Sequence, residues 1–77
     1  MQEFQIAICS FQQVQDFVAL ASQQPFDIFV GNENQNINGK DLMGMFSLDF
    51  SRPLQVQVNC DNEDVRSFRT QAEAAFS

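Results

Sequence analysis

The order of apolar and polar positions predicts short strands separated by helices. Apolar residues alternate with other residues along 2–9, 26–30 and 54–60, a pattern typical of strands that bury one face. Residues 31–34 have the composition of a turn. Residues 35–38 are then expected to form a short strand that makes a hairpin with the strand before it.

Two segments have the spacing of amphipathic helices. The first begins after Ser10, a suitable N-cap, and should end before Pro25, because proline disfavours helical backbone in the residue before it. The second begins within 61–64, where acidic side chains favour the positive end of a helix. In the first helix the apolar residues at helical spacing are Phe11, Val14, Phe17, Val18 and Ala21. In the second helix the expected buried stripe is Val65, Phe68, Ala72 and then Ala75 or Phe76.

A very short helix is predicted between the hairpin and the last strand. Asn38-Gly39 is a turn signal, and Asp41 then occupies an N-cap position, where its carboxylate can accept a backbone N–H. Helical spacing divides the following apolar residues into two faces, Met45 and Leu48 on one and Leu42, Met43 and Phe46 on the other. A short helix buries one side only, so the second cluster is expected to face solvent or a partner.

The cluster on the outer face has two interpretations. Leu42, Met43 and Phe46 are either structural, packed under a loop or against a neighbouring chain, or they form a partner-binding surface. Lys40 and Arg52 are candidates for polar contacts at the rim of that surface. The complete order is β-α-β-β-α-β-α, which favours a two-layer α+β sandwich.

Size and composition indicate a single small domain over residues 1–77. With 44% hydrophobic residues and nine phenylalanines but no Trp or Tyr, phenylalanine must supply the aromatic burial. A net charge of −6 argues against nucleic acid or an anionic membrane as partner. The N-terminus has no basic start followed by an apolar run, and no segment reaches the roughly 20 apolar residues of a membrane span, so the expected location is the cytoplasm.

The sequence offers little material for a metal or redox site. Cys9 and Cys60 do not make a disulfide framework, and each is expected to be a free, unreactive thiol that is buried or lies at a strand edge. The chain contains no histidine and no Cys-x-x-Cys pair. Neither a metal site nor a cofactor is therefore expected.

The segment from Lys40 to Leu48, with the letters KDLMGMFSL, resembles the second-helix motif of the histidine-containing phosphocarrier protein (HPr) family. The usual pattern there is Lys-Ser, an aliphatic residue, Met-Gly, two apolar residues and Ser-Leu. The resemblance extends over about residues 17–64, mainly through the order of strands and helices. It implies an HPr-like open-faced sandwich with a four-stranded antiparallel sheet.

The resemblance also implies a site whose chemical groups this chain lacks. In the family, a histidine at the start of the first helix accepts phosphate from phosphoenolpyruvate through enzyme I, and an arginine helps to hold the phosphoryl group. Counting back from Phe17, the histidine position is Ser10, the arginine position is Gln12 and the following proline is Gln13. Ser10 is therefore expected to be inactive as an acceptor and to act as a helix cap.

Asp41 is a second departure from the family pattern. In many members this position is a serine that a regulatory kinase phosphorylates, and the phosphorylated form binds a sugar-responsive transcription factor. Asp41 either caps the helix, as aspartate does in many proteins, or mimics the phosphorylated state with one permanent charge in place of roughly −1.5 to −2. The two roles are compatible.

The resemblance and the missing histidine together favour a non-catalytic, HPr-like regulatory domain. It is similar to the catabolite-repression HPr-like paralogues, which also lack the acceptor histidine. The expected partner is a phosphotransferase-system protein or a transcriptional regulator, bound through the short helix by a monomer or weak dimer. The alternative is a phosphocarrier of the phosphoenolpyruvate-dependent sugar phosphotransferase system that uses an atypical acceptor or serves for docking only.

Overall fold

Strands and helices follow one another in the predicted order. The computed structural model describes residues 2–32, 35–60 and 62–76 of the chain. The elements within this part are β1 (Gln2–Ile6), α1 (Phe11–Ser22), β2 (Ile28–Asn32), β3 (Gln35–Asn38), α2 (Leu42–Met45), β4 (Leu54–Val58) and α3 (Glu63–Ala75). The predicted order β-α-β-β-α-β-α is therefore confirmed.

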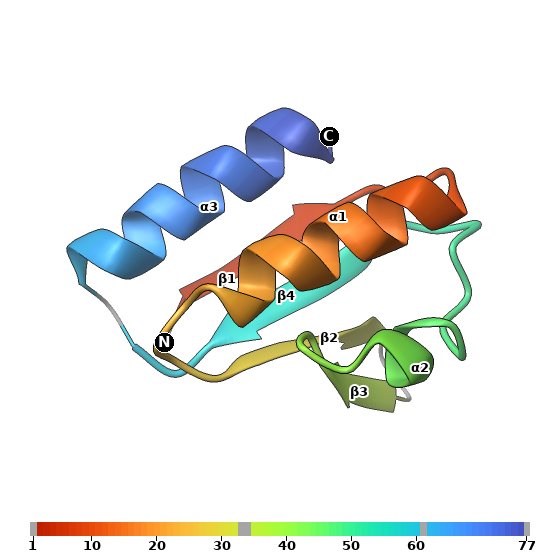
Figure 1. The fold of residues 1–77 in the computed structure, drawn as a ribbon, viewed down its shortest axis with the longest axis horizontal. Helices are drawn as coiled ribbons and strands as arrows, with labels where there is room; N and C mark the ends of the chain where they lie inside the picture. Colours follow the sequence, from red (N-terminus) through yellow and green to blue (C-terminus); the bar gives the residue numbers. More distant parts are fainter. Residues whose placement is uncertain (1, 33–34, 61, 77) are drawn as a thin grey trace.

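The four strands form one antiparallel sheet in the order β1-β4-β2-β3. The N-terminal strand β1 thus pairs with β4, and Phe4 lies opposite Val56. The long helices α1 and α3 cover one face of this sheet, while α2 lies beside β3 (Figure 1). In the described part of the chain the other face carries no helix, so the molecule is an open-faced α+β sandwich, as predicted.

The core lies between the sheet and the two long helices, and phenylalanine rings fill much of it. The ring of Phe68 is within 6.1 Å, centroid to centroid, of the rings of Phe4, Phe17 and Phe26. At the end of α3 the buried residue is Phe76 rather than Ala75, and its ring lies 5.6 Å from that of Phe17. The buried stripe predicted for the last helix is therefore confirmed, with Phe76 as its last member.

Both long helices begin with a side-chain cap, of which only Ser10 was predicted. The Ser10 hydroxyl accepts the Gln13 N–H at 3.3 Å, as predicted. Asn62 Oδ1 accepts the Val65 N–H at 3.1 Å and caps α3. Residue 61, which the sequence also assigns to this helix start, lies outside the described residues. The helix α1 ends at Ser22, before Pro25.

Several predicted boundaries are wrong by a few residues. The strand predicted at 2–9 ends at Ile6, because Ile6 pairs with Leu54 and β4 begins there, directly after a proline that has no N–H to donate. The strands predicted at 26–30 and 54–60 are Ile28–Asn32 and Leu54–Val58.

Because the strands are shorter than predicted, the cysteines lie outside them. Cys9 and Cys60 lie beyond the strand ends, both thiols are free, and Cys9 is exposed rather than buried.

The hairpin also differs from its prediction. Gly31 and Asn32 belong to β2 rather than to a turn, because Gly31 pairs with Asn36 and Asn32 pairs with Gln35. The other two predicted turn residues, 33 and 34, lie outside the described part. A Cβ on Gly31 would lie 1.7 Å from the Gln35 carbonyl oxygen, so only glycine allows the two strands to approach this closely.

Candidate protein-binding surface

The short helix α2 has the predicted position but not the predicted cap. Asp41 precedes the helix with an extended backbone (φ −102°, ψ 101°), yet its carboxylate caps no backbone N–H. The carboxylate lies beside Gly44 instead, where an added Cβ would be 2.9 Å from Oδ2. The backbone carbonyl of Asp41 accepts the Met45 N–H at 3.0 Å. The capping role proposed for this carboxylate is therefore wrong, because it lies along the side of a single helical turn rather than over its end.

The apolar residues of α2 and the turn after it divide largely as predicted. Met45 and Leu48 are buried in the core. Met43 is 76% exposed and Phe46 is 37% exposed. Leu42, however, is half-buried and packs against the core. It lies three residues before Met45, only about 60° away around the helix, so it shares the buried side more than the outer one.

The sequence pattern did not identify Phe11 as part of this surface. Phe11 is 73% exposed, although it has the spacing of the helix α1 stripe. Its ring packs edge-on against that of Phe46, with centroids 5.5 Å apart and planes at 71°. Phe11 is the first residue of α1, directly after the cap, and its place at the helix end is the signal that it lies away from the sheet. We call Phe11, Met43 and Phe46 the aromatic surface.

A shallow apolar hollow lies next to the aromatic surface. It has a volume of about 310 Å³ and is lined by Cys9, Ser10, Phe11 and Phe50. Phe50 is half-buried and packs against the core, so it forms a fixed wall of the hollow. The exposed aromatic area therefore continues from α2 to the start of α1.

Ser10, which the sequence resemblance predicts to lie at an inactive acceptor position, caps helix α1. It is exposed, and its hydroxyl accepts the Gln13 N–H. Gln12 Nε2 donates to Asp16 Oδ1 at 3.0 Å, and Gln13 Oε1 accepts the Cys9 N–H at 2.6 Å. These side chains stabilise the helix start and provide neither a base nor a cation for phosphate. Within the described residues, no three His, Cys, Asp or Glu side chains lie close enough together to hold a metal ion.

Lys40, predicted as a polar contact at the rim of the surface, makes a hydrogen bond within the protein. Its Nζ donates to the Gln24 carbonyl at 2.9 Å, and the residue is half-buried. This bond ties the turn before α2 to the chain just after α1. Lys40 therefore holds the two segments together, and its ammonium group is engaged within the protein.

Among the described residues, none of the helices has the length and apolar character that a membrane span requires.

Asp41 is exposed beside α2, and the chain carries ten acidic against four basic residues. A protein that covers the aromatic surface consequently meets a predominantly negative molecule.

The chain matches known proteins in fold and in family. Residues 12–77 match the family model described as the PTS HPr component phosphorylation site. In structure the chain is similar to HPr-C-His from Thermoanaerobacter tengcongensis, with 26% identity and a TM-score of 0.75 over 99% of this chain and 96% of that one. It is also similar to a phosphocarrier protein HPr from Bacillus anthracis str. Ames, with 17% identity and a TM-score of 0.73 over 99% and 94% of the two chains.

No curated protein sequence matches the chain significantly. The family match nevertheless covers most of the chain and includes both the segment around α2 and the whole of α3. The chain therefore belongs to the HPr family of the phosphotransferase system.

Proposed function

We propose that this HPr-family chain does not carry phosphate itself and acts in the cytoplasm by binding a protein partner through its aromatic surface. The observation that carries the proposal is the exposed ring pair of Phe11 and Phe46, 5.5 Å apart. Large, rigid aromatic side chains contribute contact area at little entropic cost and often anchor interfaces. Met43 adds an adaptable apolar contact on the same short helix.

Two further observations support a role in binding alone. The chain has no histidine, and the groups around Ser10 are used to cap and stabilise α1. The aromatic surface also adjoins this position, since Phe11 follows Ser10 directly. A partner that docks there covers the place where the family holds its phosphoryl group. The partner class is a phosphotransferase-system protein or a transcriptional regulator, with basic groups that meet Asp41.

The first experiment measures binding to enzyme I and to a sugar-responsive regulator from the same organism by isothermal titration calorimetry. Phe46→Ala should weaken binding by about 1 kcal/mol or more, because it removes a central aromatic anchor. Asp41→Asn should weaken binding less, and mainly at low salt, because an exposed charge is screened.

Phe29→Ala is the matched control for this experiment. Phe29 is half-exposed, but its neighbours Ile28 and Val30 point into the core, so it lies on the opposite face of the sheet. Phe29→Ala should leave the affinity unchanged. Equal loss with Phe29→Ala and Phe46→Ala, or unfolding by Phe46→Ala in a thermal melt, would contradict a binding role for the aromatic surface.

A second experiment separates this function from the alternative, a phosphocarrier with an atypical acceptor. The protein is incubated with phosphoenolpyruvate and enzyme I, and its intact mass is measured. No mass change is expected, because the chain has no imidazole and, within the described residues, no basic side chain is hydrogen-bonded to Ser10. A gain of one phosphoryl group on any residue would refute the non-catalytic proposal.

A further inference from the structure

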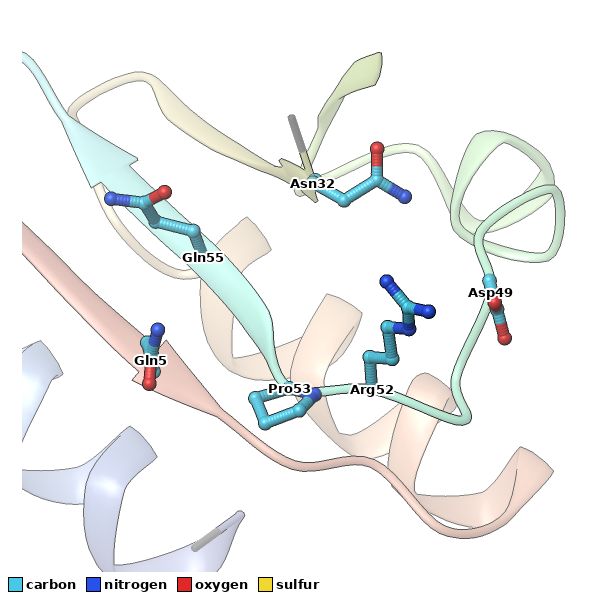
Figure 2. Close-up of a pocket in the computed structure, with 7 residues that line it drawn as sticks. Gln5, Asn32, Asp49, Arg52, Pro53 and Gln55 are labelled. Atoms are coloured by element: carbon cyan, nitrogen blue, oxygen red, sulfur yellow. The ribbon is translucent and has the colours of Figure 1, made fainter. Parts of the chain in front are cut away.

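A polar cavity opens on the face of the sheet that carries no helix. Its volume is about 580 Å³, within the range of about 300–1,000 Å³ that small-molecule sites occupy. Gln5, Gly31 and Gln55 lie on its sheet side, and the rest of the wall is made by Asn32, Asp49, Arg52 and Pro53 (Figure 2). No residue of the aromatic surface lines this cavity, so it is a separate feature of the molecule.

The strand register explains why there is a hollow at this place. Gln5 on β1 lies opposite Gln55 on β4, and Gln55 lies opposite Gly31 on β2. The three residues therefore form one row across the open face. Gly31 has no side chain to fill its place in the row, and the close approach of β3 prevents any larger residue there. The row leaves the two glutamine side chains beside a glycine that has no side chain of its own.

Arg52 contributes a guanidinium group to the wall of this hollow. Within the described residues, Arg52 makes no hydrogen bond and no ion pair, whereas Lys40 donates to Gln24 and Arg69 pairs with Glu73 at 2.6 Å. Figure 2 shows the guanidinium directed across the cavity towards Asn32. A guanidinium fork binds a carboxylate or phosphate through two parallel N–H donors. The cavity thus offers one anion-binding group.

The other wall limits the charge of the anion. The Ser51 hydroxyl donates to Asp49 Oδ1 at 2.7 Å and the Ser51 N–H donates to it at 2.9 Å. These bonds, together with the charge of Arg52, hold the pKa of Asp49 below its ordinary value. Asp49 therefore carries a negative charge at neutral pH, and the whole protein has a net charge of −6. A multiply charged anion would be repelled, while a single carboxylate on Arg52 is tolerated.

The remaining polar groups suit hydroxyls. Gln55 Nε2 donates to Glu3 at 3.0 Å, which leaves its Oε1 to accept from a ligand. The Gln5 amide has no hydrogen bond within the described chain and can both donate and accept. The Asp49 carboxylate has further lone pairs that can accept O–H donors. No aromatic side chain lines the cavity, so it has no surface on which an apolar ligand would stack.

We propose that this cavity binds a small, hydroxyl-rich monocarboxylate of the sugar-acid class. Its carboxylate lies on the Arg52 guanidinium, and its hydroxyls lie between Gln5, Gln55 and Asp49. This site goes beyond the proposed protein-binding function and does not depend on it.

The test is a titration of the ¹⁵N-labelled protein with gluconate, followed by backbone amide shifts at constant ionic strength. Saturable shifts are expected at Gly31, Gln55 and residues 49–52. Arg52→Gln should raise the dissociation constant about tenfold or more, since a charge-assisted hydrogen bond of about 1.5–3 kcal/mol is lost. Arg66→Gln is the matched control, because it makes the same charge change at an exposed position on α3 and should alter the constant less than about twofold.

Two other probes test the ligand class, namely sorbitol, which lacks the carboxylate, and glucose 6-phosphate, which carries more charge. Both should bind more weakly than gluconate. Absence of saturable gluconate shifts, or equal binding by the Arg52→Gln protein, would overturn the site. Sorbitol that binds as well as gluconate would overturn the anion-binding role of Arg52, and tighter binding of glucose 6-phosphate would overturn the assignment to a monoanion. Arg52 is exposed, so its replacement should not disturb the fold. The spectrum of the Arg52→Gln protein without ligand checks this.

Discussion

Ser10 stands where the sequence resemblance to the family places the phosphoacceptor, and its hydroxyl accepts a backbone N–H at the start of α1. A hydroxyl in this position satisfies one of the donors that every helix start leaves without an intrahelical partner. Gln12 and Gln13 likewise make local bonds with Asp16 and Cys9. At the scale of single residues, the groups that replace the family's chemistry are those that stabilise the helix.

This structural role of Ser10 can be measured. Ser10→Ala should lower the free energy of unfolding by about 1 kcal/mol, the usual cost of losing an N-cap side chain. Urea denaturation followed by circular dichroism at 222 nm gives this value. Ser10→Asn keeps a capping oxygen and should restore most of the stability. Equal stability of the Ala and Asn variants would mean that the hydroxyl contributes nothing as a cap.

Single residues also show where the sequence pattern is sufficient and where it is not. Met45 and Leu48 are buried and Met43 and Phe46 are exposed, as helical spacing predicts. The same spacing misplaces Leu42 on the outer side, because one turn of helix is too short to separate its faces sharply. Helical spacing also does not distinguish Phe11 from the residues of α1 that pack on the sheet. Spacing shows which side of a helix is apolar, but not which part of its length lies over the sheet.

At the scale of elements, α3 follows its sequence closely. The predicted stripe of Val65, Phe68 and Ala72 is buried, and Phe76 continues it. The strongest determinant is Phe68, whose ring meets three others in the core. A full phenylalanine side chain at this point joins α3, α1 and β1.

Phe68→Ala should therefore be among the most destabilising changes in the chain. The expected loss is about 3–5 kcal/mol in the free energy of unfolding, the usual range for a phenylalanine removed from a core. A whole domain is often stable by only about 5–15 kcal/mol, so this loss is a large fraction of the total and should lower the melting temperature markedly. Thermal melts compare it with Phe29→Ala, which changes a half-exposed ring. Similar melting temperatures for the two variants would show that Phe68 does not hold α3 in place.

The sheet shows what sequence alone leaves open. Alternation identifies the strands, but it does not give their register, and the polar cavity depends on the register. Gln5 and Gln55 become neighbours only because β1 pairs with β4 with Ile6 opposite Leu54. Gly31 likewise is a residue type typical of turns. In the structure it is a strand residue, because it pairs with Asn36 on one side and with Gln55 on the other. The cavity was therefore not predictable from the sequence.

At the scale of the whole molecule, the family fold brings distant segments together. The N-terminal strand pairs with the last strand, and the Ala7 N–H donates to the Phe76 carbonyl. The two functional proposals occupy different parts of this frame, the aromatic surface at the ends of α1 and α2 and the polar cavity on the open side of the sheet. One can be removed by substitution without touching the other.

The pairing of β1 with β4 determines how much of the chain the fold requires. A fragment of residues 1–53 keeps β1, α1, the hairpin and α2 but lacks the strand that lies between β1 and β2. We expect it to be unfolded, with little dispersion in its ¹H–¹⁵N spectrum, because its sheet has lost the central connection. A cooperative thermal transition in the fragment would contradict this expectation.

The same pairing has a consequence for synthesis in the cell. As the nascent chain leaves the ribosome, residues 2–6 emerge well before their partner strand at 54–58 is translated. Until then the apolar side chains of Phe4 and Ile6 have no strand to pair with, a situation that favours aggregation. The hairpin of β2 and β3 can form early, since its partners are close in sequence. The sheet is therefore completed only after β4 has been translated, because β4 pairs with both β1 and β2.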